Sequence, residues 1–181
     1  MLFICLIHLY PNAYSYYFCI RKCKKLQTKM DTAPVVVEET FDAPIYKVWA
    51  AITDKDKMKQ WYFDLAAFKA EVDFEFSFMG ENDGRKFKHL CRITEIMPGK
   101  KLAHTWQYEG YTGMSVVTFE LFDDGSKTGV KVTHEGLESF PVTEHKDFAK
   151  ENFMGGWTYI IGTSLKRYLS PALSEGAGEI K

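Results

Sequence analysis

Acid–base or nucleophilic chemistry would need side chains such as His104, His134 and Cys91, which fall on predicted strands. An imidazole titrates near neutral pH and can take a proton from a thiol or hydroxyl, provided that nucleophile, base and orienting group lie within hydrogen-bond reach. The sequence has no Gly-x-Ser-x-Gly turn to expose a nucleophile, and a buried histidine is more often a hydrogen-bonded core residue. We therefore predict no catalytic residues and keep His104 as a residue that lines an internal site.

The remaining polar motifs lack the pattern of a catalytic, phosphate-binding or metal site. Glu120 and Glu135 have the strand parity opposite to the inward-facing positions, which predicts solvated side chains. Residues 80–84 hold two glycines but no lysine and hydroxyl at the places that a phosphate-binding loop needs. Cys19 and Cys23 are followed by no second pair of ligands, so a zinc site is not expected. The sequence thus predicts no metal and no cofactor.

Charge is distributed unevenly along the 181 residues, although the whole chain has a formal charge of only −1. Residues 1–29 hold five of the 23 basic residues and no acidic one, so the remainder holds 18 basic and 24 acidic residues, a charge of −6. A domain with that charge is a poor match for a phosphate backbone, and we expect no nucleic-acid partner. Aromatic residues make up 15% of the chain, which favours a large core or an apolar cavity.

Residues 1–29 are apolar and tyrosine-rich, then basic, and do not match the rest of the chain. A secretory signal has its basic residues before the apolar run, and a membrane span needs about 20 apolar residues, whereas this run breaks at Pro11. Three interpretations remain open: a non-native or disordered extension, an uncleaved anchor with its basic flank inside the cell, and a native extension of unknown role. We expect residues 30–170 to form one domain and residues 171–181 a flexible tail.

The domain is predicted to begin with one strand and two short helices. Residues 35–41 are rich in β-branched residues, which predicts the strand. Pro44 is expected in the first turn of a helix, and Asp54 is expected to begin a second one. Five further strands follow: residues 74–78 alternate phenylalanine with polar residues, and a turn at residues 123–126 joins the last two strands. Strands joined by tight turns are typical of an antiparallel sheet.

The longest predicted element is a helix over residues 144–169. Its apolar or small residues recur at three- and four-residue spacing, Thr143 can cap its amino end, and Pro171 would help to end it. Gly155 and Gly156 are unusual in the middle of a helix, where each costs about 1 kcal/mol relative to alanine. We favour close packing against a neighbouring element as their reason, and the alternative is space for a ligand.

Together these elements predict an α+β fold, in which a curved antiparallel sheet is wrapped around the long carboxy-terminal helix, with two short helices after the first strand. A helix on a curved sheet encloses a space lined by inward-facing side chains. We predict that a small hydrophobic ligand binds in this cavity. The predicted lining residues are His104, Trp106, Tyr108, Val117, Phe119, Val132, Trp157 and Ile161.

The order and spacing of several short motifs resemble the helix-grip (START-like, SRPBCC) superfamily, and within it the domains related to the activator of the heat-shock-protein-90 ATPase. The motifs are Asp42-Ala43-Pro44 with Val48-Trp49, Met58 to Trp61, Thr94 to Pro98 with Leu102 and Thr105-Trp106, and Gly156-Trp157 with Leu165 and Leu169. The resemblance covers residues 35–169 and implies an antiparallel sheet that grips the carboxy-terminal helix over an apolar cavity. Related eukaryotic co-chaperones contact heat-shock protein 90 and also carry an amino-terminal activation motif. Residues 1–29 hold no such motif, so full ATPase activation is not expected.

Three functions remain open at this stage. The first is a module that binds a small hydrophobic molecule and has a stress-related role. The second is a co-chaperone-like module whose acidic domain contacts a chaperone, and the third is an enzyme of the cyclase or hydrolase type found elsewhere in the superfamily. We favour binding over catalysis. Cys91 is the only cysteine after residue 29, which favours a cytoplasmic protein, and we expect a monomer or homodimer that contacts membranes only if residues 1–29 are a native anchor.

Overall fold

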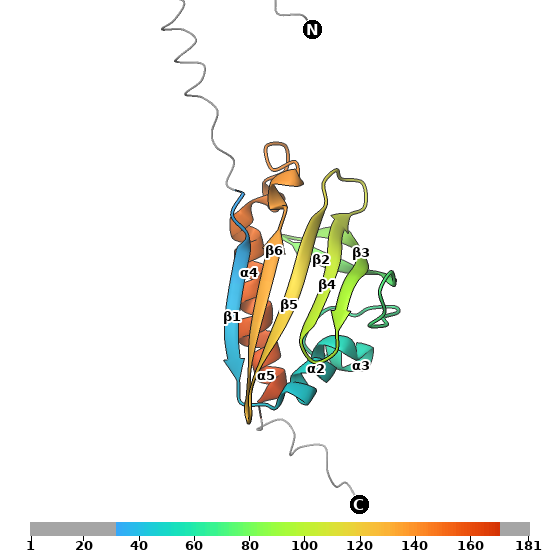
Figure 1. Ribbon diagram of the computed structural model, residues 1–181. Helices are drawn as coiled ribbons and strands as arrows, with labels where there is room; N and C mark the ends of the chain where they lie inside the picture. The colour runs from blue at the N-terminus through green and yellow to red at the C-terminus, as the bar shows by residue number, and fades with distance from the viewer. Residues whose placement is uncertain (1–31, 171–181) are drawn as a thin grey trace, which may run out of the picture. The chain divides into compact units, whose positions relative to one another are not determined.

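One six-stranded antiparallel sheet is the main element of the computed structural model, which describes residues 32–170 (Figure 1). The strand order is β1-β6-β5-β4-β3-β2, which confirms the predicted antiparallel sheet. The predicted extension and tail, residues 1–29 and 171–181, lie outside the described residues. The strands are β1 (Val35–Phe41), β2 (Glu75–Asn82), β3 (Arg85–Met97), β4 (Lys101–Tyr108), β5 (Ser115–Asp124) and β6 (Lys127–Glu135).

A long helical run covers one face of this sheet. It consists of α4 (Lys150–Tyr159), the π-helical η3 (Ile160–Leu165) and α5 (Lys166–Leu169), which follow one another without a break. The run lies behind β1, β6 and β5 in Figure 1, and both α4 and η3 contact β1. The fold is therefore α+β, with a curled sheet around a carboxy-terminal helix, as predicted. None of the helices within residues 32–170 combines the length and the apolar character needed to cross a lipid bilayer.

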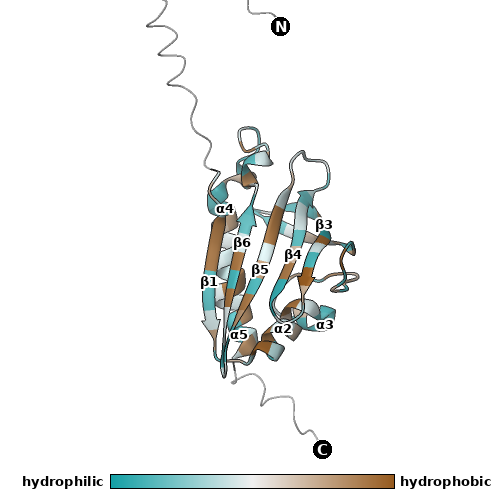
Figure 2. Ribbon diagram, in the orientation of Figure 1, coloured by the Kyte–Doolittle hydropathy of each residue, from teal (hydrophilic) through white to brown (hydrophobic). Residues whose placement is uncertain are grey.

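The core lies between the sheet and the helical run because the strands alternate buried and more exposed residues. In β6 every second residue from Thr128 to His134 is buried. The register places Leu102, Phe119 and Val132 side by side on three neighbouring strands, where they are 3%, 4% and 1% exposed. Figure 2 shows the resulting change between apolar and polar positions along the strands. Since side chains of a strand alternate between its faces, one face of the sheet presents a continuous apolar surface to the helix.

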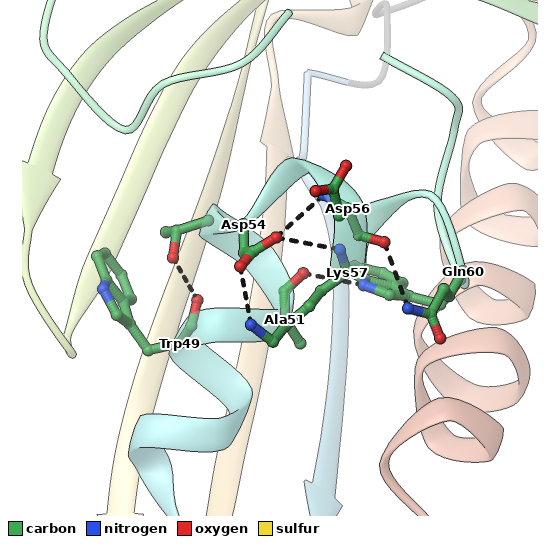
Figure 3. Close-up of polar contacts among 8 residues, drawn as sticks. Trp49, Ala51, Asp54, Asp56, Lys57 and Gln60 are labelled. Carbon is green, nitrogen blue, oxygen red and sulfur yellow. Dashed lines mark hydrogen bonds and ion pairs between the residues drawn. The ribbon is translucent and has the colours of Figure 1, made fainter. Parts of the chain in front are cut away.

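Two short helices, α2 (Ile45–Thr53) and α3 (Lys55–Met58), lie at one end of the strands (Figure 1). Pro44 is the N-cap residue of α2, one position before the helical turn in which it was expected. Asp54 begins α3 as predicted, because its Oδ1 accepts hydrogen bonds from two backbone N–H groups of the first turn, at 3.0 and 3.2 Å (Figure 3). These bonds satisfy amide groups that have no partner within the helix itself.

The carboxy-terminal helix begins later than the sequence predicts. The predicted start at Glu144, with Thr143 as its cap, is wrong, because α4 begins at Lys150. The preceding η2 (Lys146–Phe148) is a single 3₁₀ turn. The segment between Thr143 and η2 has no apolar side chain at helical spacing, whereas the ring of Phe148 is 3% exposed and packs against other aromatic rings. Burial of the Phe148 ring therefore fixes the backbone path before α4. An uninterrupted helix from Glu144 would not follow that path.

The two mid-helix glycines do not pack closely against another element. A Cβ atom added to Gly155 or Gly156 would meet nothing within 4 Å, so the favoured prediction of close packing is wrong. The π-helical η3 also differs from the regular helix that was predicted. Within it, an added Cβ at Gly162 would lie 3.3 Å from Oε1 of Glu39 on β1, so this glycine is the one that lets the helix approach the sheet edge. The open space at Gly156 belongs to the pocket described next.

Candidate functional site

A pocket of about 190 Å³ lies between the sheet and the start of the carboxy-terminal helical run. Its walls come from β2, β3 and β4 on one side and from η2 and α4 on the other. Seven of the fifteen lining residues are phenylalanine, tyrosine or tryptophan: Phe63, Phe87, Trp106, Tyr108, Phe148, Phe153 and Trp157. The acidic and amide side chains in the wall are Glu81, Asn82, Asp147 and Asn152. The pocket is thus mainly apolar, with a few polar groups, which is the usual composition of a small-molecule site.

The structure distributes the eight predicted site residues over three places. Those that line this pocket are Trp106, Tyr108 and Trp157. A separate cavity of only about 10 Å³ is lined in part by His104 and Phe119. The residues that are buried in the core, at 0–1% exposure, are Val117, Val132 and Ile161. The ligand-binding role of all eight remains a prediction.

His89 on β3 is a lining residue that the sequence reasoning missed. Its side chain is 6% exposed, its ring stacks on Phe78 with 4.3 Å between centroids, and its Nδ1 atom has no hydrogen-bond partner. Burial lowers the pKa of His89 from 6.5 to about 4, so the imidazole is neutral at pH 7. The signal that could have found His89 is its strand parity, because it lies two residues from Phe87 and from Cys91 and shares their buried face of β3.

Gly80 on the neighbouring strand β2 sets the position of this imidazole. A Cβ atom added to Gly80 would lie 2.5 Å from Cε1 of His89, which is closer than real Cβ contacts come. Any larger residue at position 80 would therefore push the histidine ring out of its place. Gly80 and His89 both line the pocket, so the absence of a side chain at position 80 fixes where the His89 ring lies in the wall.

Nε1 of Trp106 is a second buried polar atom of a residue that lines this pocket, and it makes no hydrogen bond of standard geometry. The rings of Trp106 and His89 meet edge to face, with centroids 4.7 Å apart. Burial raises the pKa of the adjacent Tyr108 phenol, and a hydrogen-bonding contact with the Trp106 side chain offsets part of this effect. A buried donor or acceptor that is left unpaired costs about 1–3 kcal/mol.

Trp157, the third predicted pocket residue, is held by a chain of hydrogen bonds through His134 and Ser115. The indole Nε1 of Trp157 donates to Nδ1 of His134 at 3.0 Å. Because an indole N–H can only donate, Nδ1 of His134 is the acceptor and Nε2 carries the proton that is donated to Oγ of Ser115 at 2.7 Å. The hydroxyl of Ser115 in turn donates to the carbonyl oxygen of Trp106 at 3.4 Å.

This chain of hydrogen bonds positions side chains and does not activate a nucleophile. With its proton on Nε2, His134 cannot accept the proton of Ser115 as a general base. Burial lowers the pKa of His134 to about 3, and the fields of two other buried histidines add to the effect. The arrangement therefore fastens the helical run to the sheet by way of Trp157.

His104 and Cys91, the other candidates for acid–base or nucleophilic chemistry, are buried away from the pocket lining. Nδ1 of His104 donates to the carbonyl oxygen of Thr105 at 2.9 Å, and burial lowers the pKa of His104 to about 4. Burial raises the pKa of the Cys91 thiol well above its ordinary value, which keeps it in the poorly nucleophilic protonated form. In the part of the chain that the structure describes, no three side chains of the metal-binding types come together.

A carboxylate ties the segment before α4 to the β2–β3 hairpin at one side of the pocket. Oδ1 of Asp147 accepts hydrogen bonds from Nδ2 of Asn82 at 3.0 Å and from Nη2 of Arg85 at 2.7 Å. The side chain of Asp147 is 5% exposed, whereas that of Arg85 is 61% exposed. Nδ2 of Asn152 donates to the carbonyl oxygen of Asp147 at 3.0 Å. Asp147 is thus paired with Asn82 of the wall and with Arg85 outside it, and the described lining residues themselves include no lysine or arginine.

Residues 42–170 match the sequence profile of the family described as "Activator of Hsp90 ATPase homolog 1-like protein". No curated protein matches the chain. The sequence resemblance to the activator family, noted above from short motifs, thus extends over most of the described residues.

Several solved structures have a similar fold. DynU16, a protein of the dynemicin biosynthetic locus, is 24% identical with a TM-score of 0.61. The match covers 77% of this chain but only 48% of DynU16, so this chain spans about half of its length. CV1439 from Chromobacterium violaceum is 20% identical with a TM-score of 0.64, covering 76% of this chain and 97% of that one. MLL2253 from Mesorhizobium loti is 25% identical with a TM-score of 0.60. The match covers 75% of this chain and 96% of MLL2253. These similarities support the fold.

Proposed function

This chain belongs to the family of activator of Hsp90 ATPase homolog 1-like proteins, and from that premise we propose that it binds a small hydrophobic molecule in the pocket between β2, β3, β4 and α4. The fold of this family is typically a binding domain for hydrophobic ligands. The single observation that carries the proposal is the aromatic pocket, whose wall includes Gly156, a mid-helix position with open space in place of a side chain.

The volume of the pocket limits the size of the ligand. Pockets for drug-sized molecules have volumes of roughly 300–1,000 Å³. An apolar cavity of about 150 Å³ is enough to bind benzene. The pocket of about 190 Å³ lies near the lower of these values, so we propose a ligand with one ring or an aliphatic group of similar bulk.

The two adjacent glycines provide a matched test of the site. Both lie in α4 with open space where a Cβ would be, but only Gly156 lines the pocket. Gly156→Leu should therefore fill the pocket and lower the affinity for small apolar compounds at least tenfold, whereas Gly155→Leu should leave it unchanged. Both substitutions improve helix propensity, so neither is expected to unfold the domain. Titration followed by the fluorescence of Trp106 and Trp157, which line the pocket, measures the affinity.

Native mass spectrometry of the purified protein complements this titration, since it detects a retained small molecule and the oligomeric state together. Equal binding by the two glycine variants would place the ligand elsewhere and contradict the proposal. Unchanged emission and melting temperature across a panel of one-ring apolar compounds would contradict it as well.

A second candidate function is contact with a chaperone, which the family description supports. The charge of −6 outside residues 1–29 suits a basic partner surface. Co-precipitation with the heat-shock protein 90 of the same cell at low salt tests this candidate, and the absence of a complex there would remove it. A cytoplasmic location and a stress-related role stay predictions.

A further inference from the structure

We propose that β2, the open edge of the sheet, binds an extended segment of a partner protein as an additional antiparallel strand. The segment has basic side chains near both ends and an apolar side chain that enters the pocket beside Gly80. The inference goes beyond the proposed function, because its main contacts are made by backbone groups of the edge strand. It follows from the hydrogen-bond register of β2, from the space beside this strand and from its charge.

The two edges of the sheet differ in what covers them. At one edge, β1 packs against α4 and η3, and Glu39 of β1 pairs with Lys166 at 3.5 Å. At the other edge, β2 pairs with β3, and no helix of residues 32–170 makes a comparable contact with it. An uncovered edge strand is a template for a further strand. The sheet can therefore be extended at β2.

The hydrogen-bond register identifies the backbone groups of β2 that face the open edge. The turn at residues 83–84 has positive φ angles of 48° and 76°, which is the hairpin turn whose flanking residues, here Asn82 and Arg85, form a hydrogen-bonded pair. At the other end, the N–H of Ile93 donates to the carbonyl oxygen of Phe74 at 3.0 Å. Because such pairs alternate along antiparallel strands, the even-numbered residues of β2 bond to β3. The residues that direct N–H and C=O to the open edge are Glu75, Ser77, Met79 and Glu81.

Open space borders this edge on both faces of the sheet. On the buried face, residues 80–82 line the aromatic pocket of about 190 Å³. On the outer face, Glu75 and Ser77 border a hollow of about 800 Å³, whose walls also include Ala66 and Ala67. Within residues 32–170, no backbone–backbone hydrogen bond outside the β2–β3 ladder uses the outward groups of β2. A strand placed beside β2 therefore meets donors and acceptors that are available to it.

The side chains of β2 determine the sequence of the partner segment. Side chains that lie opposite each other on paired strands share a face of the sheet, so a residue opposite Gly80 points toward the aromatic pocket and should be apolar. On the outer face, Glu75 pairs with Arg92 but remains 72% exposed, and Glu81 is exposed as well. Lysine or arginine opposite these two carboxylates would complement them. The charge of −6 outside residues 1–29 favours the same kind of partner.

A second copy of this chain is a poor occupant of the edge. Two copies of β2 in full antiparallel overlap would place Glu75 of each copy opposite Glu81 of the other. Like charges directly opposite each other on paired strands are destabilising. A partner segment with basic residues at these places turns the repulsion into attraction, and for this reason we favour a different protein over self-association.

The test titrates the full chain with the synthetic peptide KLVTTVK, blocked at its carboxy terminus and labelled with a dye at its amino terminus, and follows the fluorescence anisotropy. In antiparallel alignment the two lysines lie opposite Glu81 and Glu75, and the leucine lies opposite Gly80. We expect KLVTTVK to bind at low salt, and ELVTTVE, which has glutamate in place of each lysine, to bind at least tenfold more weakly. In Glu81→Lys this preference should fall about fivefold, because one attractive pair becomes repulsive.

Met79→Pro tests the edge itself. Proline lacks the N–H group that Met79 directs to the open edge, and an edge strand tolerates it there because no hydrogen bond to β3 is lost. We expect the affinity for KLVTTVK to fall at least tenfold. Met79→Val keeps the N–H group and is the matched control, with an affinity within about twofold of the wild type. Since Met79 does not line the pocket, both variants should bind one-ring apolar compounds as the wild type does.

Methylation of the peptide provides a second readout that does not depend on the folding of Met79→Pro. The N–H of the first valine of KLVTTVK faces β2, whereas the N–H of the leucine faces away from it. N-methylation of this valine should therefore abolish binding to the wild-type protein, and N-methylation of the leucine should preserve it.

Equal affinity of KLVTTVK for the wild type and for folded Met79→Pro, or an equal effect of the two methylations, overturns the inference. Native mass spectra that show dimers of the wild type and monomers of Met79→Pro overturn it too, because the occupant is then a second copy. If one-ring apolar compounds bind and KLVTTVK does not, the inference fails and the proposed function stands. If KLVTTVK binds and the one-ring compounds do not, the inference stands and the proposed function fails.

Discussion

Two of the buried histidines, His134 and His89, differ in how far their ring nitrogens are hydrogen-bonded. His134 has a partner at each ring nitrogen and is used entirely in fixing Trp157 and Ser115. His89 keeps one ring nitrogen without a partner, and it borders a pocket. Since both imidazoles are neutral at pH 7, the difference lies in hydrogen bonding and not in charge.

Replacing Trp157 by phenylalanine tests the structural role of the His134 chain. The substitution leaves Nδ1 of His134 buried without a donor and removes part of a side chain that is 3% exposed. We expect the free energy of unfolding to fall by about 3 kcal/mol, measured by urea denaturation at pH 7. Tyr159→Phe, at a position 60% exposed on the same helix, should change it by less than about 0.5 kcal/mol. A loss of similar size in both variants would contradict the assigned role.

The sequence predicts which residues face inward, but not which of them border a space. Strand alternation correctly placed Trp106, Val117 and Val132 in the interior. Only Trp106 reaches the pocket, whereas the two valines are covered completely. The difference depends on how far the helix stands from each strand, which is a property of tertiary packing. His89 was missed because the predicted lining residues were taken from β4, β5, β6 and the helical run, and none was taken from β3.

At the scale of elements, the segment before α4 shows where local sequence patterns lose their predictive value. The hairpin turn between β5 and β6 was predicted correctly, because the turn residues and the alternation on both sides agree. The path of η2 depends instead on contacts with distant strands, through Asp147 to Arg85 and Asn82. No pattern within residues 143–149 contains that information.

Asp147→Ala should loosen this segment without unfolding the domain. It removes one ion pair and one hydrogen bond to a nearly buried carboxylate, and because Arg85 is largely exposed we expect a loss of only about 1.5 kcal/mol in stability. Hydrogen exchange of the amides of η2 and the first turn of α4 should become faster. In Asp64→Ala, which removes an exposed ion pair with Lys59, stability should fall by less than about 0.5 kcal/mol and this exchange should stay the same. Unchanged exchange in Asp147→Ala would show that the segment does not depend on the ion pair.

At the scale of the whole domain, three buried neutral histidines make stability depend on pH. Burial lowers the pKa values of His89 and His104 from 6.5 to about 4 and that of His134 to about 3. In the unfolded chain these groups bind protons below about pH 6.5, whereas the folded domain resists protonation until lower pH. Stability is therefore complete above pH 6.5 and is lost as the pH falls toward 4.

We expect the free energy of unfolding to fall by about 1.4 kcal/mol per pH unit for each of the three histidines between about pH 6 and pH 4.5. Urea denaturation at several pH values in this range measures the slope. Isothermal calorimetry of acid unfolding in two buffers should find that almost three protons are taken up. A slope that corresponds to less than one proton would contradict the burial of neutral histidines.

The strand order has a consequence for the synthesis of the protein. The earliest strand of the domain, β1, pairs only with β6, and the helix that covers them is encoded last. While the ribosome is still producing β2 to β5, β1 has no partner to bind, and contacts between such distant segments form slowly. The nascent chain must therefore keep an apolar strand from aggregating until translation of the domain is nearly finished.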